Sequence, residues 1–198
     1  MKRLKAVVMV GLLGVSSLGY ANDIYVEQVG SSSTVTITQQ GTGNTVGNST
    51  DSIYIGSGSN TVSIDQIGDS NILAMVVNGS SANTTVVTTG SGNTQTINCG
   101  TTVSAGCSGS TITQTVTGDD NIITQNLGAG ANHTSNITVT GDTNTVTHTS
   151  TATGTTSMNA TISGNLNTVG VTQSGMTVQN VTINSTGNSN SITVNQSN

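Results

Sequence analysis

The side chains that could carry catalytic chemistry are few and widely spaced. The 198-residue chain contains two histidines, two cysteines, eight acidic residues and three basic ones. It has no Gly-x-Ser-x-Gly elbow, no His-Glu-x-x-His motif and no pair of carboxylates beside a candidate base. His133 and His148 are flanked by Thr, Ser and Asn, so we expect both rings to be exposed to solvent. The sequence therefore predicts no catalytic residue, no cofactor and no enzymatic activity.

Four acidic residues raise the question of calcium binding, because they fall within a recurring Gly-x-x-Asn phrase. They are Asp69, Asp119, Asp120 and Asp142. Calcium-binding β-helix repeats carry a Gly-Gly-x-Gly-x-Asp pattern, whereas this chain has no Gly-Gly pair. Asp in a tight turn commonly caps that turn through hydrogen bonds to nearby backbone groups. We therefore predict turn-capping aspartates and no metal site.

The two cysteines lie in the longest interval between two of these phrases. Cys99 and Cys107 are separated by a short Gly-, Thr- and Ser-containing segment. In an exported chain, a disulfide that closes this loop is the favoured interpretation. A metal pair or redox pair is disfavoured because no third or fourth ligand is near in sequence. A loop of this length closed by a disulfide gains about 2–3 kcal/mol of stability.

The Gly-x-x-Asn phrase returns along the whole chain and defines its organisation. From Gly118 onward each glycine follows the previous one by 23 residues, and the earlier intervals are 27, 22 and 28 residues. A recurring period of this size is typical of solenoids. The glycines and asparagines of the phrase are Gly41 and Asn44, Gly68 and Asn71, Gly90 and Asn93, Gly118 and Asn121, Gly141 and Asn144, Gly164 and Asn167, and Gly187 and Asn190.

Hydrophobic β-branched residues alternate with Thr, Ser and Asn on both sides of each phrase. Ile123, Val146, Val169 and Ile192 lie five residues after their glycines. Alternation with a period of two predicts half-buried strands, and the phrase predicts a tight turn in which Gly or Asn adopts a positive φ. We therefore predict an all-β fold, a β-solenoid of stacked strand–turn–strand repeats of about 23 residues with roughly seven to eight turns.

Residues 1–21 form a separate segment with the pattern of a secretory signal peptide. Lys2, Arg3 and Lys5 precede a short apolar run, and the small residues Gly19 and Ala21 follow it. The apolar run is too short to span a bilayer, so we predict cleavage after Ala21 rather than a membrane anchor. The remaining residues 22–198 are predicted to form one repeat domain.

The composition after residue 21 excludes several functions. This segment has no Pro, Phe, Trp, Lys or Arg and retains all eight acidic residues. Without cationic side chains, a basic patch for nucleic acid or for an anionic membrane surface cannot form, and we expect no membrane insertion. Because aromatic residues are so few, a thin core repeated many times is the remaining route to an ordered structure.

These residues resemble the curlin repeats of bacterial curli fibres. The unit of that family reads Gln-x-Gly-x-x-Asn-x-Ala, with a further Gln after the following strand. The run Gln66-Ile67-Gly68-Asp69-Ser70-Asn71 is most similar to it, and Ala74 follows three residues later. The resemblance implies that glutamines join the glycines and asparagines in structural ladders. The matching glutamines are Gln28, Gln39, Gln66, Gln125, Gln173 and Gln196.

The same resemblance implies a function and a location. It implies a structural subunit of a secreted, extracellular amyloid-like fibre on the bacterial cell surface, acting in adhesion and in the biofilm matrix. The implied partners are further copies of this chain, a second curlin-type subunit as nucleator and an outer-membrane secretion pore.

The physics of stacked strands leads to the same expectation. Stacking at ~4.8 Å aligns Asn and Gln amides into ladders and Val or Ile side chains into a dry seam. Soluble β-proteins protect their sheet edges with Pro or Lys, and the repeats here have neither and run to Asn198 without a capping segment. We therefore expect end-to-end polymerisation. Since no charged residue follows Asp142, we expect the C-terminal end to be the more adhesive one.

Two other classes of β-solenoid compete with the fibre hypothesis. Monomeric ice-binding solenoids display files of Thr-x-Thr, and alternating threonines occur here at Thr143, Thr145, Thr147, Thr149, Thr151 and Thr153. Threonine does not recur at one fixed position of the repeat in sequence, however, whereas Gly, Asn and Val do. A β-helical adhesin or carbohydrate-processing enzyme would need the aromatic and acidic clusters that grip sugars, which this chain lacks.

Overall fold

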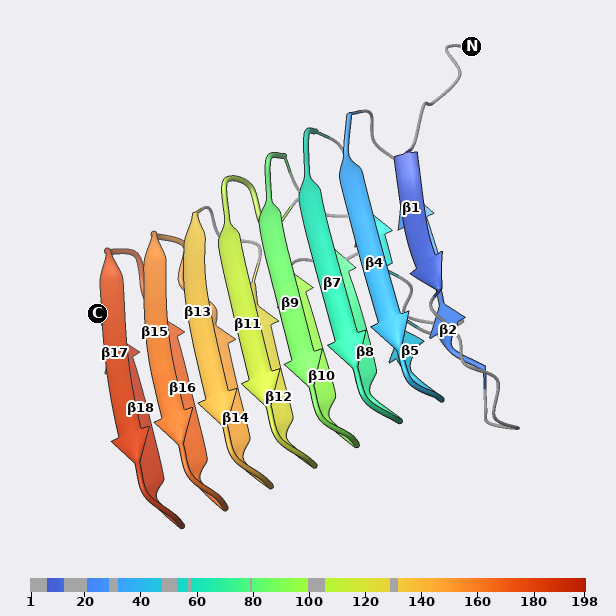
Figure 1. Cartoon of the computed structure of the whole chain (residues 1–198). Coiled ribbons are helices and arrows are strands. Elements are labelled where there is room, and N and C mark those ends of the chain that lie inside the picture. Colours follow the sequence, from blue (N-terminus) through green and yellow to red (C-terminus); the bar gives the residue numbers. More distant parts are fainter. Residues whose placement is uncertain are drawn as a thin grey trace.

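The chain folds into a parallel β-solenoid, with strands of neighbouring repeats side by side along its length (Figure 1). The structure is a computed structural model, and it describes residues 7–12, 21–28, 32–47, 53–56, 58–78, 80–99, 106–128 and 132–198. These residues form strands and no helix, which confirms the all-β prediction. None of them belongs to a helix long and apolar enough to cross a bilayer.

The strands belong to two parallel sheets that face each other. Sheet A has eight strands in the order β1-β4-β7-β9-β11-β13-β15-β17. Its strands are β1 (Val7–Leu12), β4 (Thr34–Gln40), β7 (Thr61–Ile67), β9 (Asn83–Thr89), β11 (Thr111–Thr117), β13 (His133–Thr140), β15 (Thr156–Ser163) and β17 (Gln179–Thr186). Successive strands in space are also successive repeats in sequence, as a solenoid requires.

Sheet B has ten strands and supplies the second half of each repeat. Its main path is β18-β16-β14-β12-β10-β8-β5-β2, and β3 and β6 lie off this path. Its strands are β2 (Asp23–Ile24), β3 (Val26–Gln28), β5 (Thr45–Val46), β6 (Ile53–Ile55), β8 (Ile72–Val77), β10 (Thr94–Cys99), β12 (Ile122–Leu127), β14 (Thr145–Ser150), β16 (Thr168–Ser174) and β18 (Ser191–Ser197).

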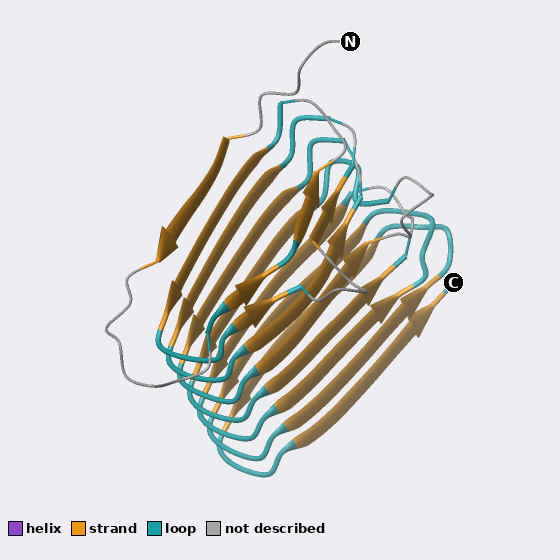
Figure 2. Cartoon of the chain, turned by 90° about the vertical axis from the view of Figure 1, so that its right-hand side faces the viewer, coloured by secondary structure: helices purple, strands orange, loops and turns teal. Residues whose placement is uncertain are grey.

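One strand of sheet A, the Gly-x-x-Asn corner after it and the next strand of sheet B make up what we call a rung. About seven rungs stack, the first beginning with β4 and the last ending with β18. Figure 2 looks along the stack and shows the two layers of strands joined by superposed loops. The repeat length predicted from the sequence is therefore the length of one rung.

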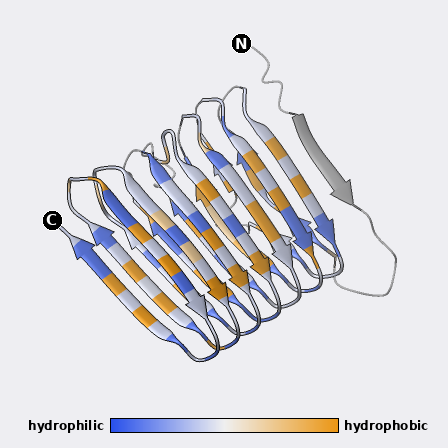
Figure 3. Ribbon diagram, turned by 60° about the vertical axis from the view of Figure 1, so that its left-hand side comes forward, coloured by the Kyte–Doolittle hydropathy of each residue, from blue (hydrophilic) through white to orange (hydrophobic). Residues whose placement is uncertain are grey.

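Alternation along the strands decides which side chains fill the space between the sheets. In β4, β7, β9 and β11 the second, fourth and sixth residues are buried and their neighbours are more exposed. Figure 3 shows the resulting bands of hydrophobic and polar residues. Residues one repeat apart pair directly, as Val139 pairs with Ile162. Each buried position therefore becomes a column of side chains that runs the length of the stack.

The apolar part of the core falls into two clusters rather than one. The first runs from Val35 to Leu127 and the second from Val116 to Ile183. Both consist almost entirely of Val, Ile, Leu, Met and Ala, since the chain contains no Phe or Trp. Polar side chains described below lie where the two clusters meet.

Sheet B extends half a rung beyond the first complete rung. Residues 22–28, which we call the N-terminal half-rung, contain β2 and β3 and pair with β5 and β6. On the sheet A side the corresponding place is taken by β1, whose backbone pairs in parallel with β4. β1 belongs to the segment predicted to be a signal peptide, and residues 1–6 and 13–20 of that segment lie outside the described residues.

Candidate functional site

The asparagines of the corners form one continuous buried ladder. Asn144 shows the pattern: its side-chain amide donates to Asn121 Oδ1 (3.0 Å) and to the carbonyl of Gly164 (2.8 Å). Its own Oδ1 accepts from the backbone and side-chain nitrogens of Asn167, at 2.9 and 3.0 Å. Because these bonds are buried and satisfy every polar atom of the amide, each rung is held to both neighbours.

The glycine of each corner is required for both its conformation and its lack of a side chain. Gly141 has a φ of 119°, and a Cβ built on it would collide with the carbonyl oxygen of Gly164 in the next rung. The left-handed residue of the corner is the one before asparagine, as Thr143 (φ 57°) and Leu166 (φ 60°) show. The predicted positive φ is therefore found at the corner glycine and at the residue before the asparagine, and the asparagine itself does not need it.

The aspartates of the corners bond between rungs. Asp69 Oδ1 accepts from the backbone nitrogen of Thr42 at 2.7 Å, and Asp142 Oδ1 accepts from that of Asp119 at 2.9 Å. In the last rungs Asn188 plays the same part toward Asn165. The prediction that the aspartates cap their own turns locally was wrong for Asp69, Asp119 and Asp142, whose Oδ1 atoms accept from backbone nitrogens of the preceding rung.

The predicted glutamines lie in several columns rather than one. Gln39 donates to Gln66 Oε1 at 2.9 Å and Gln173 donates to Gln196 Oε1 at 3.3 Å, so each pair forms part of a ladder. Gln125 is buried in a third column, where it pairs in register with His148. The side chain of Gln28 lies outside the described residues.

A buried glutamine network that the sequence did not predict lies in the middle of the stack. Gln114 donates to Gln95 Oε1 at 2.7 Å, and Gln125 donates to Gln114 Oε1 at 2.6 Å. Gln95 also bonds Thr88 on the facing sheet. These bonds cross from sheet B to sheet A where the two apolar clusters meet. The interruption of the hydrophobic columns by Gln95 and Gln114 was the available signal.

Both histidines are buried, so the prediction that they are exposed was wrong. His133 and His148 are each 1 % exposed. His133 Nδ1 lies 2.6 Å from Thr156 Oγ1 and its Nε2 lies 3.1 Å from the carbonyl oxygen of Gly128. His148 Nε2 lies 2.9 Å from Gln173 Oε1, whereas its Nδ1 has no partner. The polar residues that flank each histidine do not indicate its burial, because in an alternating strand the neighbours of an inward-facing residue point outward.

Burial keeps both rings neutral near pH 7. Desolvation lowers the pKa of His148 to about 4, against a raising effect of the Gln173 hydrogen bond, and the nearby His133 lowers it further. Desolvation likewise lowers the pKa of His133, partly offset by the Gly128 carbonyl. Neutral, tightly enclosed imidazoles serve the core as structural groups.

The cysteine segment contributes to the first apolar cluster. Cys107 is fully buried, belongs to that cluster and is disulfide-bonded. The side chain of Cys99 and residues 100–105 of the predicted loop lie outside the described residues.

The outer face of sheet A carries a threonine-rich column that the sequence-based prediction overlooked. One such column is Thr89, Thr117, Thr140, Ser163 and Thr186, whose members pair in register from strand to strand. The prediction that threonine recurs at no fixed position was therefore wrong, because this column lies at the residue directly before each corner glycine. Hydroxyl and methyl groups recur along it at the strand spacing.

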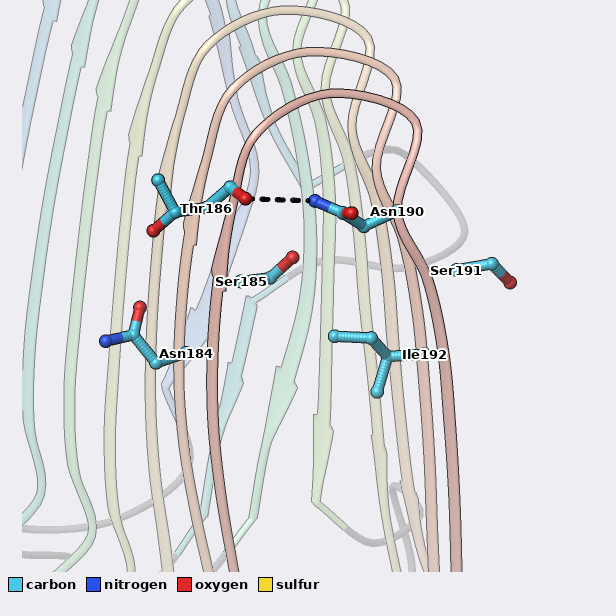
Figure 4. Close-up of a pocket in the computed structure, with 6 residues that line it drawn as sticks. All are labelled: Asn184, Ser185, Thr186, Asn190, Ser191 and Ile192. Carbon is cyan, nitrogen blue, oxygen red and sulfur yellow. Dashed lines mark hydrogen bonds between the residues drawn. The ribbon is translucent and has the colours of Figure 1, made fainter.

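The C-terminal end of the stack is an open sheet edge in this chain. Among the strands that the structure describes, β17 and β18 each have a partner on one side only. Between them lies an open hollow of about 260 Å³, shown in Figure 4, lined by Asn184, Ser185, Thr186, Asn190, Ser191 and Ile192. Ser185 Oγ is buried without a hydrogen-bond partner, and Asn190 donates back to its own corner at the Thr186 carbonyl (3.3 Å).

Apolar side chains also gather close to this end. Met176 and Val178, in the last connection before β17, are 81 % and 66 % exposed. Ile192 and Val194 of β18 are only partly buried, because no further rung covers them. The end rung thus presents backbone groups, an unsatisfied hydroxyl and apolar surface together, which is the composition of a strand-pairing interface.

Comparison of the chain with known protein families, with curated proteins and with solved structures finds no match. Among the described residues, no three His, Cys, Asp or Glu side chains lie close enough together to hold a metal ion. The most distinctive features of the described residues are the side-chain ladders and the two ends of the stack.

Proposed function

We propose that this chain is the structural subunit of an extracellular, curli-like amyloid fibre that grows by end-to-end stacking of solenoids. The observation that carries the proposal is the open end formed by β17 and β18, which continues the internal ladders without a change of geometry. A second copy that docks there makes the same contacts that internal rungs already make with each other.

Polar groups at the two ends of one column support this direction of stacking. Gln39, Gln66, Thr88, Val116, Val139, Ile162 and Ser185 occupy the same position in successive strands of sheet A. Gln39 pairs on its other side only with Leu12 of β1, so it becomes one end of the column once residues 1–21 are removed. Its Oε1 is buried without a partner, and so is Ser185 Oγ at the other end. Stacking brings an acceptor against a donor, which removes the cost of two unsatisfied groups.

The proposal includes a location and partners. Residues 1–21 direct export, and the subunit joins a fibre on the bacterial cell surface, where it serves adhesion and the biofilm matrix. Its main partner is another copy of itself. A second curlin-type subunit as nucleator and an outer-membrane secretion pore complete the proposed system, and no catalytic step is involved.

Incubation of the purified chain from Asn22 onward tests this function. Unbranched fibres that bind amyloid dyes should appear under the electron microscope, and their fragments should seed fresh protein. Protein that remains monomeric for days at high concentration, with its strand content intact, would rule the proposal out.

Ice binding is a second candidate, favoured by the threonine columns on sheet A. A flat, rigid array of hydroxyl and methyl groups spaced by ~4.8 Å between strands and ~6.6 Å along them can order water into a lattice. Thermal hysteresis measured on monomeric protein tests the ice-binding hypothesis. Replacement of Thr117 and Thr140 by Lys should abolish any hysteresis while leaving the fold intact, since both side chains point outward.

A further inference from the structure

The N-terminal half-rung makes the bonds of an asparagine ladder although it is not part of a complete rung. Asn22 Oδ1 accepts from the backbone nitrogen of Asn44 at 2.9 Å, and its amide donates to the carbonyl of Gly41 at 3.2 Å. The five asparagines from Asn44 to Asn144 make these two bonds with the rung that follows them, as Asn144 does with Asn167 and Gly164. Asn22 therefore occupies the ladder position that the asparagine of a preceding rung would take.

The half-rung also covers the apolar columns of sheet B at that end. Ile24 pairs in register with Val46 and Val26 pairs with Ile53. Both Ile24 and Val26 are partly buried and pack against the first core cluster. The half-rung thus acts as a cap on the columns that would otherwise end at β5 and β6.

The sequence of this cap matches that of the last strand of the stack. Residues 22–28 read Asn-Asp-Ile-Tyr-Val-Glu-Gln and residues 190–196 read Asn-Ser-Ile-Thr-Val-Asn-Gln. Asn, Ile, Val and Gln recur at the same four positions of the two segments, and the residues between them differ. The outward residues Asp23, Tyr25 and Glu27 are exposed.

The cap and an incoming subunit compete for the same place. If the cap stays, β18 of a neighbour can pair with β2 and β3, but β17 and β4 are then left one strand apart. In the chain from Asn22 onward, which lacks the β1 strand that otherwise pairs with β4, departure of the cap lets β18 take the place of β2 and β3. β17 then pairs directly with β4, so both sheets run on without a gap. The unsatisfied Ser185 and Gln39 lie at the ends of one column and favour the second arrangement.

We propose that residues 22–28 are an intramolecular stand-in for the C-terminal strand of a neighbouring copy, and that this strand displaces them when the copy docks. The inference rests on the proposed end-to-end assembly and adds its regulation. The half-rung protects the N-terminal end of a free subunit, and exchange of one Asn-x-Ile-x-Val-x-Gln strand for another opens that end for growth. The strand that replaces residues 22–28 belongs to a second copy of this chain.

A disulfide staple tests whether the cap must leave. Asp23 and Thr45 pair in register on neighbouring strands, and neither side chain is buried, so Asp23→Cys with Thr45→Cys places two thiols within bridging distance. The oxidised double variant should lose elongation on preformed seeds, and reduction should restore it. Equal elongation in both redox states would overturn the proposal.

Two controls separate the staple from other effects of oxidation. The parent chain with and without reductant measures the contribution of the native disulfide at Cys107. A matched staple between inner rungs, Thr145→Cys with Thr168→Cys, links a register pair that docking does not disturb, so its elongation should be insensitive to oxidation. Loss of elongation in this control as well would also count against the cap.

A peptide-binding measurement distinguishes failure of this inference from failure of the fibre proposal. A labelled synthetic peptide of residues 190–198 should bind the free subunit when the staple is reduced and should not bind when it is oxidised. Redox-dependent binding without fibre formation would retain the cap and reject the fibre. Equal fibre growth and equal peptide binding in the two redox states would reject the cap and retain the fibre proposal. If the protein neither forms fibres nor binds the peptide, both proposals are rejected.

Discussion

Asn144 illustrates how one side chain holds three rungs together. It is fully buried and its amide satisfies contacts to Asn121, Gly164 and Asn167. Asn144→Ala should leave several buried groups unsatisfied and lower the free energy of unfolding by about 2–4 kcal/mol. Thr145→Ala, a change at the less buried next position, is the matched control and should cost less than about 1 kcal/mol. Denaturant unfolding followed by circular dichroism compares them, and equal losses would contradict a ladder role.

His148 gives the fold a predicted sensitivity to acid. Because burial lowers its folded-state pKa from the ordinary 6.5 to about 4, the unfolded chain binds a proton first as the pH falls. Stability is therefore complete above pH 6.5 and is lost progressively down to about pH 4, by about 3 kcal/mol at most. His148→Val, which copies Val171 of the next rung, should flatten unfolding midpoints measured across this range. Parallel pH profiles of parent and variant would contradict the assignment.

At this scale the sequence predicts the repeated residues well and the isolated ones poorly. The glycines and asparagines recur seven times, so their common role was visible before the structure. The histidines occur once each and sit among polar residues, and only the inward register of β13 and β14 shows that they are buried. Gln95 and Gln114 looked like interruptions of a column, because a bond across the core has no signature along the chain.

The strands themselves were predictable because alternation and period both survive in the sequence. A one-residue slip would turn the Val and Ile columns toward solvent, so the pattern fixes the register within each rung. The outer column that contains Thr117 and Thr140 was equally visible, because both residues directly precede a corner glycine and lie 23 residues apart. It was overlooked because the alternating threonines of residues 143–153 were compared instead.

The cysteine segment is expected to stabilise the middle of the stack without being needed for assembly. Cys99→Ser with Cys107→Ser should cost about 2–3 kcal/mol of stability through loss of the cross-link, and burial of Cys107 in the first cluster adds to this cost. Fibre formation should persist, and cleavage by a protease within residues 101–105 should become faster. Peptide mapping after limited proteolysis measures this, and a double variant that fails to fold would contradict it.

The whole molecule is asymmetric, with its charge confined to the N-terminal part. No charged side chain follows Asp142, and the open strands β17 and β18 lie in the neutral region. Thr193→Lys with Asn195→Lys places cations on an exposed strand beside Ile192 and Val194, which should discourage pairing while the fold survives. Seeded growth should slow strongly.

A matched pair at the other end decides whether the two ends differ. Thr36→Lys with Thr38→Lys changes outward positions of β4 in the same way, and we expect weaker slowing from it. The comparison uses equal protein and seed concentrations at several salt concentrations. Equal slowing by both pairs would show that the ends do not differ, and no slowing by either would remove edge pairing as the mechanism of growth.

Diffraction from aligned fibres tests end-to-end stacking most directly. If each solenoid continues the ladders of the next, all strands lie perpendicular to the fibre axis, and the ~4.7–4.8 Å strand spacing must appear as a sharp reflection along that axis. With the cap displaced, seven rungs per subunit give an axial repeat of roughly 34 Å. A strand reflection at right angles to the fibre axis would mean that subunits associate through their sides, and it would contradict the account.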